Sequence, residues 1–426
     1  MPSKRPADRS ERSAEHGNRP TDRTRYVSRR DVLGSLAAVG SIAIAGCSSL
    51  RSLLSPDPVW RRDIPNAAAA GPLTVGGDRV FVGAQDKALY GLHREDGSTV
   101  LRFETGGPIE SRPAVSADGQ TAHVHSTDGD LYTVDNTGEL RWSDEGRFDR
   151  SRIVRRGSLL VRLTFDSPDD TMTGFDAMGG ETRFERPVAT YRLNGLLDES
   201  LVVPEPVSEV ETRVTALSTT DGTVQWATDP SSSYPGVRAD TNLVITIRES
   251  RVSAYEPSDG RTRWETPIGN PGYLTELGPH VYLTLDESNS NQELVALDRK
   301  TGSRRWTQSA GLDIRAIEPT TDAVFVGSRV DDPDGGILGR IDCFELDGTR
   351  RWHTVTELPS VEHIVVIGSA VVLVSDRAFT VVDAETGTER WTHEPDSYSR
   401  LSVHAAEQSL FVSYLDDGAV ARFEID

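Results

Sequence analysis

The sequence predicts an all-β fold of small repeated sheets closed into a ring, and three observations lead to this expectation. First, a turn glycine is followed four residues later by a large apolar side chain eight times between residues 97 and 391, at intervals of 38 to 46 residues. Second, each repeat carries a short apolar run typical of a buried strand. Third, the two ends of the array look like parts of one repeat. A period near forty with several short strands per unit indicates a β-propeller.

Residues 112–146 illustrate the expected unit. Its four strands are expected at 113–115, 121–125, 131–135 and 139–143. Between the third and fourth strands, Asn136-Thr137-Gly138 forms the turn, because glycine supplies the positive φ that a tight hairpin needs. Other repeats have Asp-Gly or Thr-Gly at this point, and the glycines that define the motif are Gly138, Gly222, Gly260, Gly302, Gly348 and Gly387.

The second strand of most repeats is a continuous apolar run rather than an alternating one. Continuous runs are expected where both faces of a sheet are covered, as in a blade held between two neighbours. The runs lie at 80–82, 243–245, 324–326, 371–374 and 410–412.

Six of the seven tryptophans follow a turn glycine, and the seventh opens the array. An indole on the outermost strand can wedge between blades, and at ~200 Å² buried and ~25 cal/mol/Å² each contributes on the order of 5 kcal/mol gross. A ligand-stacking array is the alternative, and the structural role is favoured. The tryptophans are Trp60, Trp142, Trp226, Trp264, Trp306, Trp352 and Trp391.

The ends of the array are complementary. Residues 401–426 hold three expected strands and no fourth, whereas Val59-Trp60-Arg61 forms a fourth strand without the other three. Joining them completes one blade from both termini and removes exposed sheet edges. The count is then nine blades.

The motif of an apolar strand, Asp/Thr-Gly and a tryptophan four residues later resembles the PQQ-like repeat of quinoprotein dehydrogenases and of the propeller lipoprotein of bacterial outer-membrane assembly. The best matches are 294–306 and 379–391, and the resemblance covers about 57–426. It implies a propeller, usually of eight blades, so the units at 150–187 and 190–229 are candidates for a reduced or merged blade. It does not select a function, because this scaffold hosts enzymes, assembly factors and sensors.

The N-terminal residues resemble an export signal. Arg29-Arg30 resembles a twin-arginine motif, and an apolar stretch of about 15 residues, too short to span a membrane comfortably, follows it. Ile44-Ala45-Gly46-Cys47 resembles a lipobox, in which Cys47 is lipidated and becomes the new N-terminus. The expected division is a leader at 1–47, a tether at 48–56 and a propeller at 57–426. We expect a protein anchored by lipid on the outer face of the cytoplasmic membrane.

The composition is strongly acidic, with 46 basic and 66 acidic residues and a net charge of −20. Removing residues 1–46 takes away nine basic and five acidic residues and leaves 37 and 61, a net charge of −24. Lysine occurs only three times. This balance suggests a halophilic archaeon, because molar salt screens the self-repulsion of such a surface. An acidic surface also argues against nucleic acid as a partner.

Metal and catalytic motifs are weak. His123 and His125 share a strand face but have no evident third ligand, and the loop 331–336 lacks the order of a calcium loop. Cys343 is the only cysteine in the propeller, so neither a disulfide nor a CxxC motif is available. We therefore predict no metal site and no catalytic residue.

Arginines recur near the starts of the expected inner strands. If they line the central channel, its mouth could hold an anion, although chance explains most of the pattern in an arginine-rich chain. These residues are Arg112, Arg152, Arg192, Arg238, Arg315 and Arg400.

The favoured function is a monomeric, non-catalytic binding or assembly scaffold without a cofactor, acting on protein partners that the sequence does not identify. A quinoprotein-like oxidoreductase is the main alternative. It is disfavoured because the chain has no adjacent cysteines and no recognisable Glu/Asn/Asp calcium set, both of which the resemblance would imply for such an enzyme. An extracellular solute or polymer sensor is the third possibility.

Overall fold

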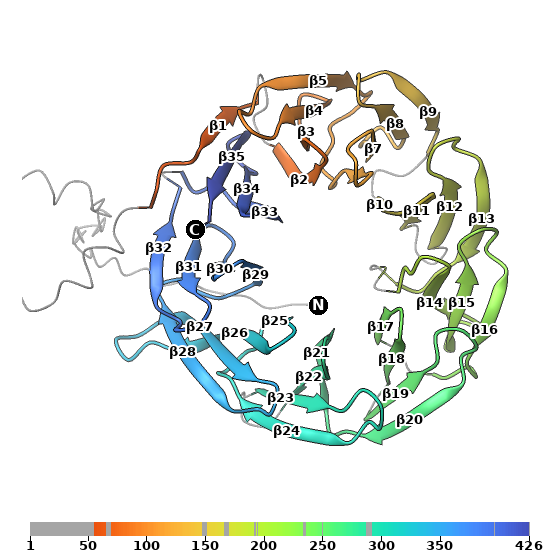
Figure 1. Ribbon diagram of the computed structural model, residues 1–426. Helices are drawn as coiled ribbons and strands as arrows, with labels where there is room; N and C mark the ends of the chain where they lie inside the picture. The colour runs from red at the N-terminus through yellow and green to blue at the C-terminus, as the bar shows by residue number, and fades with distance from the viewer. Residues whose placement is uncertain are drawn as a thin grey trace, which may run out of the picture. The chain divides into compact units, whose positions relative to one another are not determined.

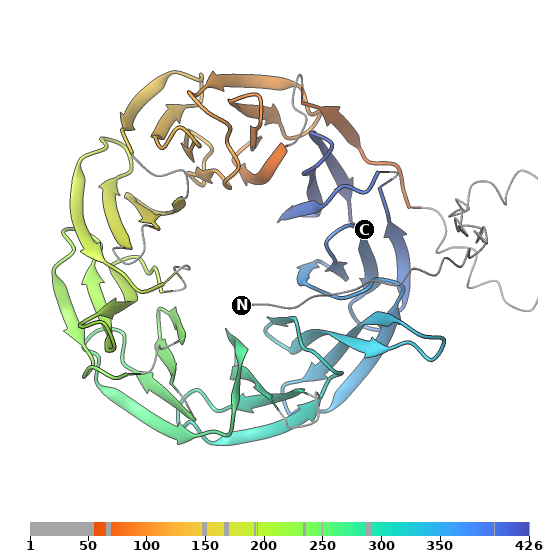
Figure 2. The same ribbon diagram turned by 180° about the vertical axis from the view of Figure 1, so that it is seen from behind.

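The computed structural model describes residues 55–64, 70–146, 151–165, 170–190, 193, 195–232, 236–248, 250–286, 292–395 and 397–425. In these ranges the chain forms nine antiparallel sheets set around a central axis, as Figures 1 and 2 show from the two sides. This arrangement confirms the predicted all-β propeller and the count of nine blades. Cys47, Arg29 and Arg30 lie outside the described residues, and so does Arg192.

The blades are numbered here in chain order from the first complete one. Blade 1 comprises β2 (Ala70–Gly76), β3 (Arg79–Ala84), β4 (Ala88–His93) and β5 (Thr99–Glu104). Blade 2 comprises β6 (Ala114–Val115), β7 (Thr121–His125), β8 (Leu131–Asp135) and β9 (Leu140–Asp144). Blade 3 comprises β10 (Ser151–Arg156), β11 (Leu159–Thr164), β12 (Thr171–Asp176) and β13 (Thr182–Pro187). Blade 4 comprises β14 (Ser200–Pro206), β15 (Thr212–Ser218) and β16 (Val224–Ala227).

The remaining blades follow the same order. Blade 5 comprises β17 (Gly236–Asp240), β18 (Leu243–Arg248), β19 (Arg251–Tyr255) and β20 (Thr262–Pro267). Blade 6 comprises β21 (Pro271–Leu277), β22 (Val281–Asp286), β23 (Gln292–Leu297) and β24 (Arg304–Ser309). Blade 7 comprises β25 (Ala316–Pro319), β26 (Ala323–Asp331), β27 (Ile337–Glu345) and β28 (Arg350–Thr356). Blade 8 comprises β29 (His363–Ile367), β30 (Ala370–Val374), β31 (Phe379–Asp383) and β32 (Glu389–His393). Blade 9 comprises β33 (Leu401–Ala406), β34 (Ser409–Tyr414), β35 (Ala419–Glu424) and β1 (Trp60–Asp63).

Blade 9 is completed by the two ends of the chain, as predicted. Strand β1 pairs antiparallel with β35, with Trp60 opposite Arg422 and Asp63 opposite Ala419. The sheet order β1-β35-β34-β33 places the N-terminal strand outermost. Figure 1 shows the red and blue ends of the ring meeting in this blade.

Blade 4 departs from the repeat, since its sheet has three strands in the described residues. The predicted irregularity at 190–229 is therefore found, whereas 150–187 forms the complete blade 3. The place of an inner strand is taken by an isolated bridge between Leu196 and Leu201 and by a hydrogen bond from Val202 N to Gly195 O, 2.9 Å long. In blade 2 the inner and outer strands begin one residue later than predicted, and the two middle strands have the predicted bounds.

The hydrophobic core lies between blades rather than within one of them. Val80, Phe81 and Val82 in the second strand of blade 1 are at most 1% exposed. Each core cluster joins neighbouring blades, as where Val372 of blade 8 packs with Val412 of blade 9. The continuous apolar runs are buried because each blade is covered on both faces.

The outer strands are joined by a contact that repeats around the ring. In blades 1 to 8 the turn glycine lies against the aromatic or apolar side chain that ends the motif of the preceding blade. A Cβ atom on the glycine would fall 2.3 to 3.3 Å from that side chain. The pairs are Gly97 with Trp60, Gly138 with Leu101, Gly180 with Trp142, Gly222 with Phe184, Gly260 with Trp226, Gly302 with Trp264, Gly348 with Trp306 and Gly387 with Trp352.

Six indoles also donate Nε1–H to a backbone carbonyl of the next blade, at 2.7 to 3.3 Å. These six tryptophans therefore combine apolar packing with a hydrogen bond across the blade interface. No helix with the length and hydropathy to cross a membrane occurs in the ranges given above.

Candidate functional site

The inner-strand arginines bind local acceptors. Arg400 is paired with Asp416, with Nη2 2.9 Å from Oδ1, and Arg315 is paired with Asp313, with Nη2 2.7 Å from Oδ2. Arg152 lies in β10 and is exposed. The positive charge of Arg315 and Arg400 is thus partly neutralised, and an anion-binding channel stays a prediction.

Two further arginines link neighbouring blades. Arg112 donates to Leu73 O and, over 3.1 Å, to Ser402 Oγ of blade 9. Arg238 of blade 5 donates to Thr275 O over 2.8 Å and lies 3.7 Å from the Glu276 carboxylate of blade 6. These contacts show the two guanidinium groups bridging inner strands, which is a structural role.

An acidic pair on the inner strands was not anticipated from the sequence. Glu276 in β21 lies opposite Tyr282, and Glu318 in β25 lies opposite Phe325, so the two carboxyl groups occupy matching positions in adjacent blades. Burial, together with the charge of Glu276, raises the pKa of Glu318 to about 7. Burial also raises the pKa of Glu276, which Arg238 partly offsets. The single glutamates gave no sequence signal because only the blade register brings them together.

The predicted histidine and cysteine positions are structural. His123 is fully buried, with Nδ1 2.7 Å from Thr133 Oγ1 and Nε2 3.1 Å from Arg155 Nη1. Burial, assisted by the charge of Arg155, lowers the pKa of His123 to about 3, so the ring is neutral. Burial raises the pKa of the Cys343 thiol to about 11. Within the described ranges no group of three or more His, Cys, Asp or Glu residues is placed to hold a metal.

Blade 7 is the most distinctive part of the ring. Strands β26 and β27 have nine residues each and are the longest of the described strands. Figure 1 shows their hairpin extending outward beyond the neighbouring blades. The tip, 332–336, falls within the loop 331–336, whose carboxylates lack the order of a calcium loop. In the structure this segment is a turn closed by hydrogen bonds from Asp332 N to Gly336 O and from Gly335 N to Asp332 O.

A buried carboxylate sets blade 7 apart at its third strand. Asp342 is fully buried and accepts two hydrogen bonds from Arg340, from Nε over 2.6 Å and from Nη2 over 2.7 Å. Arg350 Nε lies 2.8 Å from Oδ1 of the same carboxylate. Two arginines on one buried acid satisfy its oxygens and leave one net positive charge at this point.

Other blades have a neutral residue where blade 7 has Asp342. Asp342 immediately precedes Cys343, the residue of the third strand that pairs with Trp352 of the outer strand. The equivalent position in another blade immediately precedes the residue that pairs with its own outer-strand tryptophan. It holds Tyr132, Thr215, Ser253, Val295 and Thr380 in blades 2, 4, 5, 6 and 8. A carboxylate in the segment Ile341-Asp342-Cys343-Phe344 was the sequence signal that could have drawn attention to this blade.

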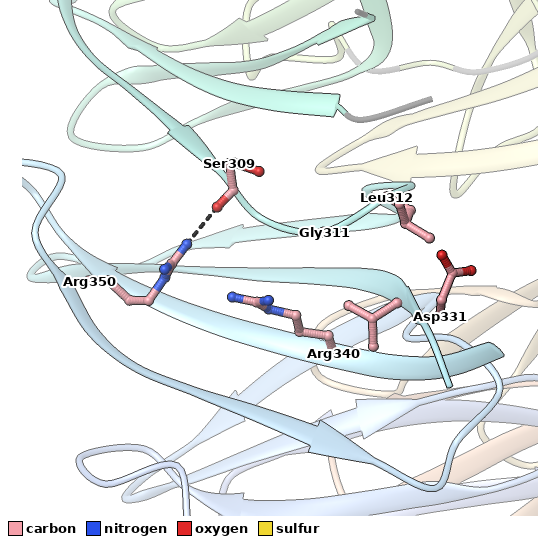
Figure 3. Close-up of a pocket in the computed structure, with 7 residues that line it drawn as sticks. Ser309, Gly311, Leu312, Asp331, Arg340 and Arg350 are labelled. Atoms are coloured by element: carbon pink, nitrogen blue, oxygen red, sulfur yellow. Dashed lines mark hydrogen bonds between the residues drawn. The ribbon is translucent and has the colours of Figure 1, made fainter. Parts of the chain in front are cut away.

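The two arginines border a pocket of about 380 Å³ between blades 6 and 7. Figure 3 shows Arg340 and Arg350 with their guanidinium groups on the Ser309 side, and Leu312 and Asp331 at the opposite end. Arg350 Nη2 donates to Ser309 O over 2.6 Å and so links the two blades. The lining is Ser309, Gly311, Leu312, Val330, Asp331, Arg340 and Arg350. This pocket, with charges of opposite sign at its ends, is the candidate functional site.

Comparison with known proteins places the chain in a family. The family profile described as Outer membrane protein assembly factor BamB matches residues 52–205 and 210–426. BamB of Shewanella oneidensis is 23% identical over 307 residues, which cover 67% of this chain and 70% of the relative. BamB of Bordetella pertussis is 23% identical over 217 residues, which cover 45% of this chain and 54% of the relative. The chain thus spans between about half and about two thirds of the length of these curated relatives.

Solved structures agree on the fold. The crystal structure of BamB from Moraxella catarrhalis has a TM-score of 0.51 at 16% identity and covers 87% of this chain and 98% of that one. The C-terminal WD40 domain of Sif2 has a TM-score of 0.52 at 12% identity, with the same two coverages. Such low identities support a propeller and nothing finer. The family profile, however, extends over all nine blades, and the chain therefore belongs to the family of the outer membrane protein assembly factor BamB.

Proposed function

We propose that the protein is a non-catalytic scaffold that holds partner proteins during assembly at a membrane, outside the cytoplasm. The observation that carries this proposal is the family match across the whole ring, because the matching relatives are named as outer membrane protein assembly factors. A closed ring with one long hairpin in blade 7 suits such a role, since the blades form a rigid frame and the loops present contact residues.

We further infer attachment by lipid at Cys47 to the outer face of the cytoplasmic membrane, after export through the Arg29-Arg30 signal. Trp60 enters the ring 13 residues after Cys47. An extended chain of that length spans at most about 45 Å, so the lipid would keep the propeller close to the membrane surface. The net charge of −24 after residue 46 supports an environment of molar salt, as in a halophilic archaeon.

The test is crosslinking of the full-length protein in native membranes in molar salt, followed by recovery of the crosslinked proteins. We expect the wild type in the membrane fraction, with a reproducible set of protein partners. Cys47→Ser should be released or left unprocessed and should lose these partners. A Cys47→Ser protein that stays processed and membrane-bound would exclude the lipid anchor. A wild type without protein crosslinks would contradict the scaffold role.

The export signal is tested separately. Replacing both Arg29 and Arg30 with lysine keeps the charge but removes the twin-arginine pattern. We expect the precursor to accumulate in the cytoplasm. Unchanged secretion would instead indicate the general secretory route.

A further inference from the structure

The pocket between blades 6 and 7 has an order of charges that points to a ligand. Its cationic end is formed by Arg340 and Arg350, which share Asp342 and so keep one net positive charge. Arg340 donates Nε–H and Nη2–H to Asp342. Arg350 contacts Asp342 through Nε and donates Nη2–H to Ser309 O. The Nη1 groups of both arginines find no acceptor among the described residues. They are therefore available to a carboxylate, which binds guanidinium groups through paired, charge-assisted hydrogen bonds.

The opposite end of the pocket is anionic. Asp331 is exposed at the end of β26, and the described residues supply no ion pair for it. It lies opposite Ile337, three residues before Arg340 on the paired strand. At about 3.3 Å per residue the backbone positions of the two ends are about 10 Å apart. Figure 3 shows the Asp331 carboxylate directed toward Leu312, away from the two guanidinium groups.

Apolar side chains line the rest of the pocket. Leu312 and Val330 line it, and Gly311 forms part of the wall. Behind Gly311 the Ser328 hydroxyl is fully buried and has no hydrogen-bond partner in the described structure. Ser328 lies directly opposite Arg340 in the hairpin, and a Cβ atom on Gly311 would fall 2.4 Å from its Oγ. A side chain at position 311 would therefore clash with Ser328 and with the backbone of Arg329.

We propose that this pocket binds an extended segment of a partner protein, with an acidic side chain on Arg340 and Arg350 and a basic side chain at Asp331. The inference rests on the proposed scaffold function and names the contact through which one partner is held. Charge complementarity at both ends fixes the direction of the segment, and the apolar middle accepts a small aliphatic residue between the charges. The buried Asp342 holds the two guanidinium groups in place before the segment arrives, which lowers the ordering cost of binding.

The binding experiment uses a capped, fluorescently labelled peptide, Glu-Val-Ser-Val-Arg, and the full-length protein in the lowest salt at which the ring stays folded. The two charges are four residues apart, about 13 Å in an extended chain, and point to the same side. We expect saturable binding with a Kd of about 0.1–1 mM, as for a short peptide with few anchors. The neutral peptide Gln-Val-Ser-Val-Gln should bind at least about tenfold more weakly. Equal binding of the two peptides, no binding of the charged one, or equal affinity for free glutamate or arginine would overturn the proposal.

Variants locate the binding to this pocket. Asp331→Lys should weaken binding at least about tenfold, whereas Asp334→Lys, in the exposed turn that follows and outside the pocket, should change it less than about twofold. The double variant Arg340→Gln with Asp342→Asn removes one cation together with the acid that it neutralises, and it should weaken binding about tenfold. Its melting temperature is measured in parallel, so that a folding defect is recognised. Asp331→Lys then decides the outcome, because this exposed position is not needed for the fold.

The same variants separate this inference from the proposed function. In the membrane crosslinking experiment, Asp331→Lys should lose at least one partner that Asp334→Lys retains. If both variants keep every wild-type partner, the pocket inference is wrong and the scaffold function stands. If the wild type itself has no partner, the result contradicts the scaffold function, on which the pocket inference rests.

Discussion

Gly348 of blade 7 lies directly over the indole of Trp306 in blade 6. A Cβ atom on Gly348 would fall 2.6 Å from Trp306 Cγ, and the same indole donates Nε1–H to Leu346 O over 2.8 Å. The spacing of glycine and tryptophan along the sequence suggests a motif inside one repeat. In the folded ring the glycine contacts the tryptophan of the preceding repeat, so the motif joins neighbouring blades.

Gly348→Ala should therefore destabilise the ring more than an ordinary turn substitution. Gly348 has a φ of 89°, and a methyl group there would also meet the indole. We expect a loss of about 2–4 kcal/mol in the free energy of unfolding, from backbone strain and displacement of the ring. Chemical denaturation in molar salt measures it.

Gly368→Ala is the matched control for the cost of placing alanine at a positive φ. Gly368 has a φ of 56° and nothing within 4 Å of the added methyl group, so about 1 kcal/mol should be lost there. Equal losses at the two glycines would mean that the contact between Gly348 and Trp306 adds nothing to stability.

Trp264 and Trp391 allow the hydrogen bond of the motif to be measured. Trp264 donates Nε1–H to Arg299 O of blade 6 over 2.9 Å. Trp391 packs against Phe379 and Phe423, with ring centroids 5.5 and 6.1 Å away, and its Nε1 has no hydrogen-bond partner in the described structure. Its neighbour is blade 9, where the two ends of the chain replace the turn that would supply a carbonyl.

Trp264→Phe should thus cost more than Trp391→Phe, by about 1 kcal/mol, because only the first leaves a carbonyl without its donor. Both changes remove the same atoms, which makes each a control for the other. A larger loss at Trp391 would show that packing, rather than the hydrogen bond, dominates this motif.

Features set by residues close together in the sequence could be predicted, and contacts between residues on different strands could not. Turn chemistry and apolar runs are local, and the turn motif repeats eight times, so the period, the middle strands and the shared ninth blade could all be read from the sequence. The pocket could not, because Arg340, Asp342 and Arg350 meet only through the register of β27 with β28. In the sequence Asp331 belongs to the loop 331–336, and only the length of β26 brings it to the pocket edge.

Closure by β35 predicts a disproportionate effect of a short deletion. Removing residues 420–426 takes away most of β35, which pairs with both β1 and β34. Two sheet edges would then be exposed, and we expect the loss of soluble, folded protein. Near-native yield and an unchanged melting temperature would show that the ring does not depend on this pairing. Glu424→Gln, which removes only the surface ion pair with Arg422, should leave both quantities unchanged.

The acidity of the chain predicts that stability depends on salt. The chain after residue 46 has a net charge of −24 and almost no lysine, and self-repulsion opposes the compact state in dilute buffer. The melting temperature should rise steeply between about 0.1 M and molar potassium chloride, as the screening length falls from about 10 Å to about 3 Å. A melting temperature that is flat over this range would contradict the inference of a halophilic environment.

Glu318 predicts a specific dependence of stability on pH. Burial first, and then the negative charge of Glu276, raise the pKa of Glu318 from 4.5 to about 7 in the folded chain. Between these two values the folded state holds more protons than the unfolded state, so the free energy of unfolding falls as the pH rises from about 4.5 to about 7.

Glu318→Gln removes this penalty and should stabilise the protein at pH 8 by about 1–2 kcal/mol, a figure reduced because the carboxyl is only partly buried. At pH 4.5 the same change should have almost no effect, and Glu385→Gln at an exposed turn should have none at either pH. Denaturation curves at the two pH values test this. An equal effect at both, or destabilisation at pH 8, would mean that the pKa of Glu318 is not raised in the folded chain.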